Sequence, residues 1–138
     1  MCGIIGAVGK VEKGFEQDVL ETIIHRGPNS TGIYSKDTLF LGHTRLSIQD
    51  LSENGNQPMF SDDKRYVIVF NGEIYNHLDI RRELLTNRVF KSSGDTETVL
   101  YAYIQHGEAI LEKLNGIFAF AIFDNVTSEI IIARDHFG

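Results

Sequence analysis

The chain contains one cysteine, Cys2, directly behind the initiator Met1. A thiolate is a strong nucleophile, but a thiol at neutral pH ordinarily needs a base beside it. Methionine is typically removed before a small residue, and Cys2 would then carry a free α-amine with a pKa of roughly 7.7–8.0. Such an amine can accept the thiol proton, which predicts an N-terminal nucleophile. The alternative is a small buried apolar residue beside Gly3 and Ile4.

Attack on an acyl carbon requires hydrogen-bond donors fixed where negative charge develops. Asn71 carries a side-chain amide, and Gly72 exposes its backbone N–H. Both follow directly on the continuous apolar segment 66–70. They are therefore candidates for an oxyanion hole. The alternative is an Asn-Gly hairpin turn, which is the commoner meaning of this dipeptide on its own.

Three charged residues could hold a small zwitterion. Arg45 lies between apolar neighbours, which is unusual for a surface arginine, and a guanidinium matches a carboxylate. Glu73 and Asp95 could each pair with an ammonium group. Their alternatives are a solvated turn residue for Glu73 and a helix N-cap for Asp95.

Composition excludes several other classes. The formal net charge is -6, and no basic cluster is interleaved with aromatic residues, so we expect no nucleic-acid partner. There is no long apolar run and no signal peptide, so we expect a cytoplasmic protein without a membrane partner. The five histidines lack the spacing of metal ligands, and no metal site is expected.

Hydrophobic periodicity predicts α+β structure in one domain over 1–138. Helices are expected over 15–24, 78–85, from Asp95 to about 104, and around 110–114. Residues 4–8 form a short apolar run, and strands are expected over 39–42, 66–70, 117–123 and 130–133, the last two as a hairpin, with loops at 25–32 and 49–58. Because 66–70, 117–123 and 130–133 are apolar without alternation, each should be covered on both faces. Sheets packed together with helices outside them satisfy this pattern.

Six motifs in order resemble the class II, or N-terminal nucleophile, glutamine amidotransferase domains, most closely the amino-terminal glutaminase domain of glutamine-hydrolysing asparagine synthetases. These motifs are MCGIIG, HRGPNSTG, GHTRLSI, NGEIYN, SGDTE and ARDHFG. The phosphoribosyl-pyrophosphate and fructose-phosphate amidotransferases share the early cysteine but differ in the HRGP, RLSI and NGEIYN stretches.

The resemblance implies a four-layer αββα sandwich of two antiparallel sheets. It also implies roles for individual residues. Cys2 would attack the glutamine side-chain amide to give a γ-glutamyl thioester, with its α-amine as base. Asn71 and Gly72 would donate to the oxyanion, and Arg45 would bind the substrate carboxylate. Glu73 and Asp95 would bind the substrate ammonium group, and backbone groups of Leu46, Ile48 and Gln49 would line the pocket.

The resemblance also has limits. The family usually has Asp where this chain has Asn29, and an aliphatic residue where it has Gln49. The chain ends at RDHFG, so we expect a C-terminally truncated domain that lacks its last strands and a downstream synthetase domain. ATP and Mg²⁺ are expected only in that domain, which would amidate aspartate, in asparagine biosynthesis, or a related carboxylate such as a sugar acid. Unpaired sheet edges would favour self-association.

Two other functions remain open from the sequence. The chain could be a non-catalytic module that binds glutamine or a partner through the same pocket. It could also be an N-terminal nucleophile hydrolase of another amide, such as a peptide. The pairing of Arg45 with Glu73 and Asp95 favours a free amino acid, L-glutamine, as the ligand.

Overall fold

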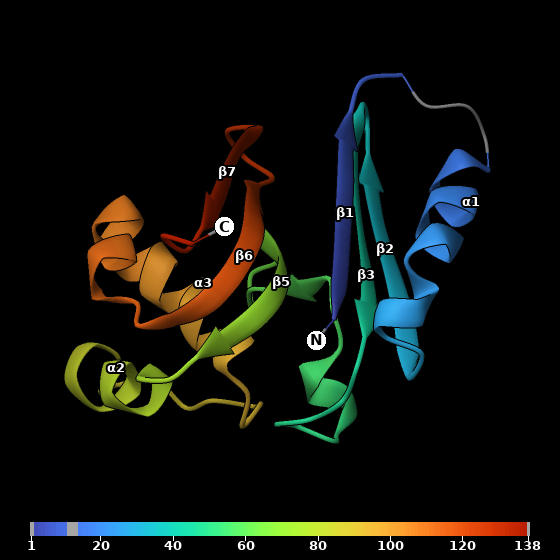
Figure 1. Ribbon diagram of the computed structural model, residues 1–138. Helices are drawn as coiled ribbons and strands as arrows, with labels where there is room; N and C mark the ends of the chain where they lie inside the picture. The colour runs from blue at the N-terminus through green and yellow to red at the C-terminus, as the bar shows by residue number, and fades with distance from the viewer. Residues whose placement is uncertain (1, 11–13, 138) are drawn as a thin grey trace.

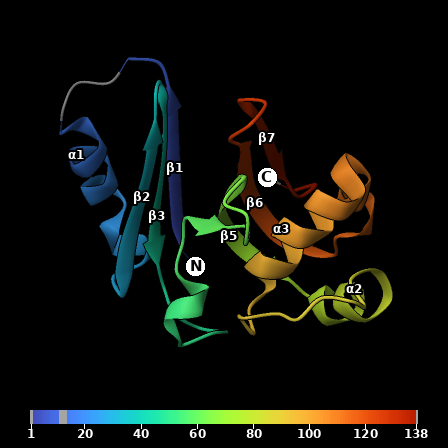
Figure 2. The same cartoon turned by 180° about the vertical axis from the view of Figure 1, so that it is seen from behind.

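Two antiparallel sheets lie face to face in the computed structural model, which describes residues 2–10 and 14–137 (Figure 1). One sheet has the strand order β1-β3-β2, and the other has the order β4-β5-β6-β7. Helix α1 covers the outer face of the first sheet, and α2 and α3 cover the outer face of the second (Figure 2). This is the predicted four-layer αββα arrangement.

The elements have the following bounds. The strands are β1 (Gly3–Val8), β2 (Ser30–Lys36), β3 (Leu39–Arg45), β4 (Met59–Phe60), β5 (Tyr66–Ile74), β6 (Gly116–Asp124) and β7 (Glu129–Arg134). The α-helices are α1 (Phe15–Thr22), α2 (His77–Leu84) and α3 (Asp95–His106), and the 3₁₀ turns are η1 (Ile24–Arg26), η2 (Glu53–Gly55) and η3 (Gly107–Lys113).

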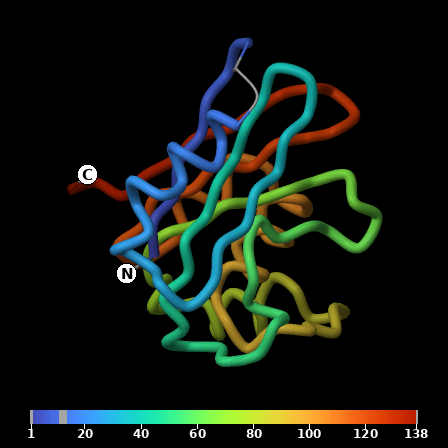
Figure 3. Tube along the Cα trace, turned by 90° about the vertical axis from the view of Figure 1, so that its right-hand side faces the viewer, coloured from blue at the N-terminus to red at the C-terminus, as the bar shows by residue number. Residues whose placement is uncertain are grey.

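The first sheet is built around β3, which is buried along its whole length between β1 and β2. Leu39 and Leu41 of β3 face the second sheet. On the other face, Gly42 leaves room for α1, because a Cβ atom there would meet Leu20 at 3.0 Å. Figure 3 shows α1 lying along the outside of this sheet.

The second sheet is covered on both faces along β5. Val67 and Val69 pack against the first sheet, while Ile68 and Phe70 pack against the helices. The residues of β6 divide in the same way, with Phe123 on the inner face. The prediction that residues 66–70 and 117–123 are covered on both faces of their sheet is therefore confirmed.

The same prediction for 130–133 is wrong in part. Ile130 packs between the sheets and Ile131 against the helices, but Ile132 is 76% exposed. Strand β7 is an edge strand of its sheet. No described strand lies over Ile132, which is on the same face of β7 as Ile130, so the face turned toward the first sheet is uncovered at this position.

Three further expectations are corrected. The predicted loop 25–32 contains η1 and the start of β2 at Ser30, and β2 pairs with β3 although its residues are mostly small and polar. Strand β4 was not predicted, because its two residues follow a polar loop. The segment around 110–114 is the 3₁₀ turn η3 rather than an α-helix.

Candidate active site

Cys2 lies immediately before β1, beside the end of β3. The backbone N–H of Leu46 donates to Sγ of Cys2, with 3.4 Å between nitrogen and sulfur, and the carbonyl oxygen of Leu46 lies 3.7 Å from the same sulfur. The carbonyl of Cys2 accepts a hydrogen bond from Nε of Arg26 at 3.0 Å. The thiol is thus held at a fixed position. Met1, whose removal would free the α-amine, lies outside the described residues.

A pocket of about 180 Å³ opens beside this thiol. Its walls come from the start of the chain, the loop after β3, the end of β5 and the start of α3. All of the predicted site residues except Asn71 line it, namely Cys2, Arg45, Leu46, Ile48, Gln49, Gly72, Glu73 and Asp95. Residues more than ninety positions apart therefore share one cavity.

Asn71 and Gly72 are central to β5 and do not form a turn, so the hairpin interpretation is wrong. Both are paired in register with β6. Gly72 has φ of +153°, and a Cβ atom there would lie 2.2 Å from the carbonyl oxygen of Ile117. Only glycine fits this position, because β6 approaches too closely for a side chain. Phe118, opposite Gly72, directs its N–H and C=O to Asp135 instead, both at 2.9 Å.

Alternation along β5 sends the N–H groups of Phe70, Gly72 and Ile74 away from β6. Oε1 of Gln57 accepts from the Phe70 N–H at 2.6 Å, and Oδ2 of Asp95 accepts from the Ile74 N–H at 2.8 Å. No side chain in the described part of the chain accepts from Gly72. The middle donor of the three is therefore open toward the pocket.

The side chain of Asn71 lies on the same face of β5 as Val67 and Val69, the face turned toward the first sheet. Its Oδ1 is buried and has no hydrogen-bond partner among the described residues. A buried polar atom without a partner is costly, at about 1–3 kcal/mol. Such a group is retained where it has another task or an unseen partner.

Arg45 is 7% exposed and is held by the loop that follows β3. Nη1 donates to the carbonyl of Ser52 at 2.8 Å and to Oδ1 of Asn56 at 2.7 Å, and Nη2 donates to the carbonyl of Asp50. The Nε–H and a second N–H of Nη2 have no partner among residues 2–10 and 14–137. These neighbouring donors suit a carboxylate bound side-on.

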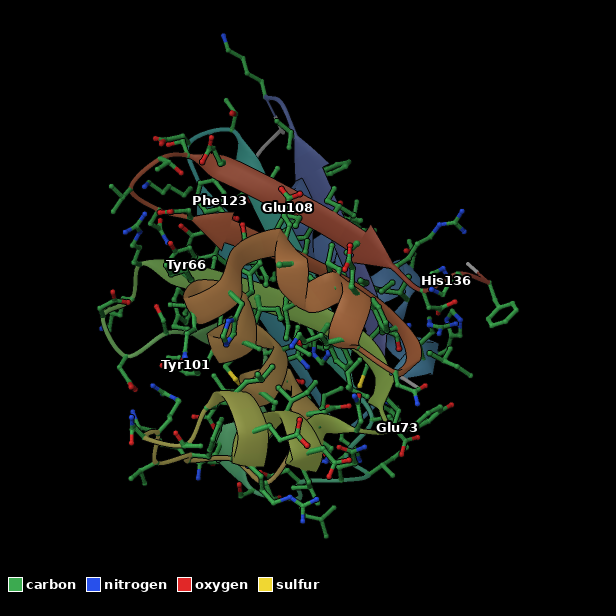
Figure 4. All side chains as sticks on the ribbon, turned by 90° about the vertical axis from the view of Figure 1, so that its left-hand side faces the viewer. Tyr66, Glu73, Tyr101, Glu108, Phe123 and His136 are labelled. Carbon is green, nitrogen blue, oxygen red and sulfur yellow. The ribbon has the colours of Figure 1, made fainter. Side chains whose placement is uncertain are left out.

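The two candidate ammonium partners differ in environment. Glu73 is exposed near the end of β5, far from Tyr66 at its start (Figure 4). Asp95 is 5% exposed in the first turn of α3. The N-cap of α3 is Gly94 and no side chain caps it, so the predicted capping role of Asp95 is wrong. Burial raises the pKa of Asp95, and the charge of Glu73 raises it further.

Sequence reasoning missed residues that support the site. Gln57, besides bonding Phe70, donates from Nε2 to Oγ1 of Thr96 at 3.2 Å. His43 is fully buried between the sheets, and neither ring nitrogen has a hydrogen-bond partner among the described residues. Burial lowers the pKa of His43 to about 4, which the backbone of Phe70 opposes only in part, and the charge of Arg45 lowers it further. His43 lies in the GHTRLSI motif, whereas Gln57 lies in none of the six motifs.

The two residues that differ from the usual family sequence, Asn29 and Gln49, are both compatible with the structure around them. Oδ1 of Asn29 accepts the backbone N–H of Ser47 at 3.0 Å, so the amide holds the loop after β3 without a charge. Gln49 lines the pocket, where a backbone role would tolerate its side chain.

Residues 2–10 and 14–137 contain neither a membrane-spanning helix nor a metal-binding cluster. No helix among them has the length and apolar character to cross a bilayer. No group of three or more His, Cys, Asp or Glu residues in this part of the chain could hold a metal ion.

A family model described as the glutamine amidotransferase domain matches residues 1–138. The chain belongs to this family. The glutamine amidotransferase domain is similar over all of its length to asparagine synthetase B [glutamine-hydrolyzing] of Escherichia coli (strain K12), at 39% identity, and to asparagine synthetase [glutamine-hydrolyzing] 1 of Lotus japonicus, at 34%. It spans about a quarter of these relatives, 26% and 24% of their lengths.

The chain has the same fold as part of a solved structure. That structure is a glutamine phosphoribosylpyrophosphate amidotransferase from B. subtilis, complexed with ADP and GMP. The TM-score is 0.79 at 20% identity, and the match covers 98% of this chain and 37% of that one. The predicted family, enzyme class and αββα fold are therefore confirmed.

Proposed function

We propose that the domain hydrolyses L-glutamine to glutamate and ammonia through a γ-glutamyl thioester on Cys2. The observation that carries this proposal is the open N–H of Gly72 in the same pocket as the Cys2 thiol. A nucleophile, an oxyanion donor, a cation and carboxylates share the pocket. This set matches the chemistry of amide hydrolysis on an amino acid.

In the first half of the reaction, the sulfur of Cys2 attacks the side-chain amide carbon of glutamine, and its proton passes to the α-amine of the same residue. The Leu46 N–H, 3.4 Å from the sulfur, stabilises the thiolate. Negative charge develops on the amide oxygen, where the Gly72 N–H and the Asn71 amide donate. The α-ammonium then protonates the leaving nitrogen, and ammonia departs.

In the second half, the α-amine takes a proton from water, and the hydroxide attacks the thioester carbon. The same donors hold the oxyanion. The carbon–sulfur bond breaks, glutamate leaves, and the sulfur of Cys2 regains its proton. Each bond made is matched by one broken, and no metal or redox cofactor takes part.

Substrate orientation follows from the charges around the pocket. The two open donors of Arg45 hold the α-carboxylate side-on. Asp95 and Glu73 receive the α-ammonium, and backbone groups of Leu46, Ile48 and Gln49 line the wall between them. The side-chain amide then points at Cys2.

The released ammonia would serve an ATP-dependent amidation of aspartate or of a related carboxylate such as a sugar acid. The glutamine-hydrolysing asparagine synthetases among the relatives support this assignment. ATP and Mg²⁺ would be bound by a synthetase domain and not by this one. We keep the cytoplasm as the expected compartment.

The test is release of glutamate from glutamine by the purified protein after removal of Met1. Cys2→Ala should lower the rate by at least about a thousandfold, the scale of losing a nucleophile. Mass spectrometry of the acid-quenched wild-type reaction should find the γ-glutamyl group on Cys2. Persistent hydrolysis in Cys2→Ala excludes the mechanism.

A panel of substrates separates the alternatives. Glutamine binding without turnover, in a chain that permanently keeps Met1, would favour a binding module. Faster turnover of a peptide or an acylated amine than of glutamine would favour a hydrolase of another amide.

Self-association stays a prediction. Strands β1 and β7 are sheet edges within the described residues, and Val8 and Ile132 are exposed on them. Exposed edges offer unpaired backbone groups to a second chain. Sedimentation velocity over a concentration series tests this, and a monomer throughout would contradict it.

A further inference from the structure

The segment 91–94 leads into α3 and carries Asp95 to the pocket. Its four backbone N–H groups are all bound by side chains. The Glu97 carboxylate accepts from Lys91 at 3.0 Å and from Ser92 at 2.7 Å. Oδ2 of Asp50 accepts from Ser93 at 2.9 Å, and the Ser92 hydroxyl accepts from Gly94 at 2.9 Å. The conformation of this segment is therefore set by side chains and not by a regular element.

Two of its carbonyl groups are bound by one side chain, Arg81 of α2, and a third, that of Lys91, accepts from Nδ2 of Asn54 at 3.0 Å. Nη1 donates to the carbonyl of Ser92 at 3.1 Å, and Nη2 donates to the carbonyl of Gly94 at 2.6 Å. Nε donates to Oγ1 of Thr98, one turn into α3, at 2.7 Å. The guanidinium lies over the ring of Phe90, 3.8 Å from its centroid. One rigid, planar group thus fixes the segment and the first turn of α3 together.

That first turn is also fixed to β5. Oδ2 of Asp95 accepts the Ile74 N–H at 2.8 Å, two residues beyond the open N–H of Gly72. Asp95 follows Gly94 directly, so a shift of the Gly94 carbonyl moves the carboxylate that faces the pocket. Arg81 itself does not line the pocket.

We propose that Arg81 is a positioning residue for recognition of the substrate α-ammonium. It acts by holding segment 91–94 so that the Asp95 carboxylate keeps its place beside Glu73. The inference rests on the proposed glutamine hydrolysis and adds to it the device that sets selectivity for an α-amino acid. A lysine cannot replace Arg81, because it lacks the planar fork that reaches two carbonyls and a hydroxyl at once.

The test compares L-glutamine with glutaramate, which has the same amide and carboxylate but no α-ammonium. The measured quantity is the ratio of kcat/KM for the two substrates. In Arg81→Met this ratio should fall toward one, by up to about a hundredfold, as expected for a misplaced binding group. The KM for glutamine should rise while kcat changes little. Arg81→Lys should recover only a small part of the ratio.

Arg82 supplies the matched control. It is the same residue type on the same helix, its side chain is 75% exposed, and within the described residues it pairs only with Asp79, on the surface. Arg82→Met should leave both the ratio and the KM for glutamine unchanged. If Arg81→Met does not fold, Thr98→Val removes one acceptor of Arg81 without changing the side-chain volume, and it should lower the ratio less than tenfold but measurably.

The outcomes separate the two claims. A wild-type protein that hydrolyses neither substrate overturns the proposed function and this inference with it. A wild-type protein that prefers glutamine, with Arg81 and Thr98 variants that keep that preference, overturns the inference alone. Lower thermal stability with an unchanged ratio would show that Arg81 only supports the fold, and would overturn it equally.

Discussion

The backbone N–H of Leu46 donates to the sulfur of Cys2 across 3.4 Å, and it joins the start of the chain to the residue that follows Arg45. Cys2 and Arg45 are therefore placed by the same short contact. The nucleophile and the proposed carboxylate site are thereby linked through Leu46.

Asn71→Ala should lower kcat for glutamine hydrolysis by about a hundredfold to a thousandfold, because one oxyanion donor is lost. The KM should change little, since the donor acts mainly on the transition state. Steady-state kinetics with glutamine measures both quantities. Asn76→Ala is the control, because within residues 2–10 and 14–137 the Asn76 side chain bonds only the backbone of Lys113 and Asn115. An unchanged kcat in Asn71→Ala would contradict the role.

Gly72→Ala should destabilise the fold by about 2 kcal/mol or more, because the new Cβ would lie 2.2 Å from a backbone oxygen of β6. Gly107 is the matched control. It has φ of +60°, but nothing lies within 4 Å of its Cβ position. Gly107→Ala should cost about 1–3 kcal/mol from backbone strain alone, because its φ of +60° and ψ of −149° suit glycine, so Gly72→Ala, which adds a collision, should cost more. Urea unfolding of both variants measures the difference, and equal losses would contradict the close approach at Gly72.

The pH dependence should report Asp95. Its pKa is raised by burial and by Glu73, so its carboxylate takes up a proton at a higher pH than an ordinary aspartate. Because only the ionised form attracts the substrate ammonium, kcat/KM should fall as the pH is lowered through this raised pKa. Asp95→Asn should raise the KM and remove this step, leaving the fall that protonation of the Cys2 α-amine itself produces. Asp79→Asn, on the exposed face of α2, should keep the step, and an unchanged profile in Asp95→Asn would assign the step elsewhere.

His43 should make stability pH-dependent. Its pKa is lowered from 6.5 to about 4 by burial, so the unfolded chain binds the proton more readily than the folded one. Stability should be full above pH 6.5 and fall as the pH drops toward 4. Between pH 7 and pH 5 the loss is roughly 2 kcal/mol, from the same linkage. His43→Leu should lose less over this range when both are unfolded by urea, and equal losses would contradict the assignment.

The sequence predicted the sheets best where apolar residues run without a break, as in 66–70. It missed β2, whose small polar residues have weak strand preference and pair only because β3 is present. Gly72 was expected to offer its N–H at a turn, yet it does so at a strand edge, because only the pairing of β5 shows which way an N–H points. Arg81 and Glu97 were not predicted, since their partners are backbone groups that only the fold brings near.

Whether the N–H of Gly72 is open to the pocket depends on its even-numbered position along β5. Along β5, even-numbered residues direct their N–H groups to the pocket side, and odd-numbered residues direct theirs to β6. A slip of one residue between these strands would keep the sheet, yet it would bring the N–H groups of odd-numbered residues to the pocket and turn that of Gly72 inward. Because the same slip would turn every side chain of β5 to the opposite face, one inserted residue at the start of β5 should abolish activity and lower stability together.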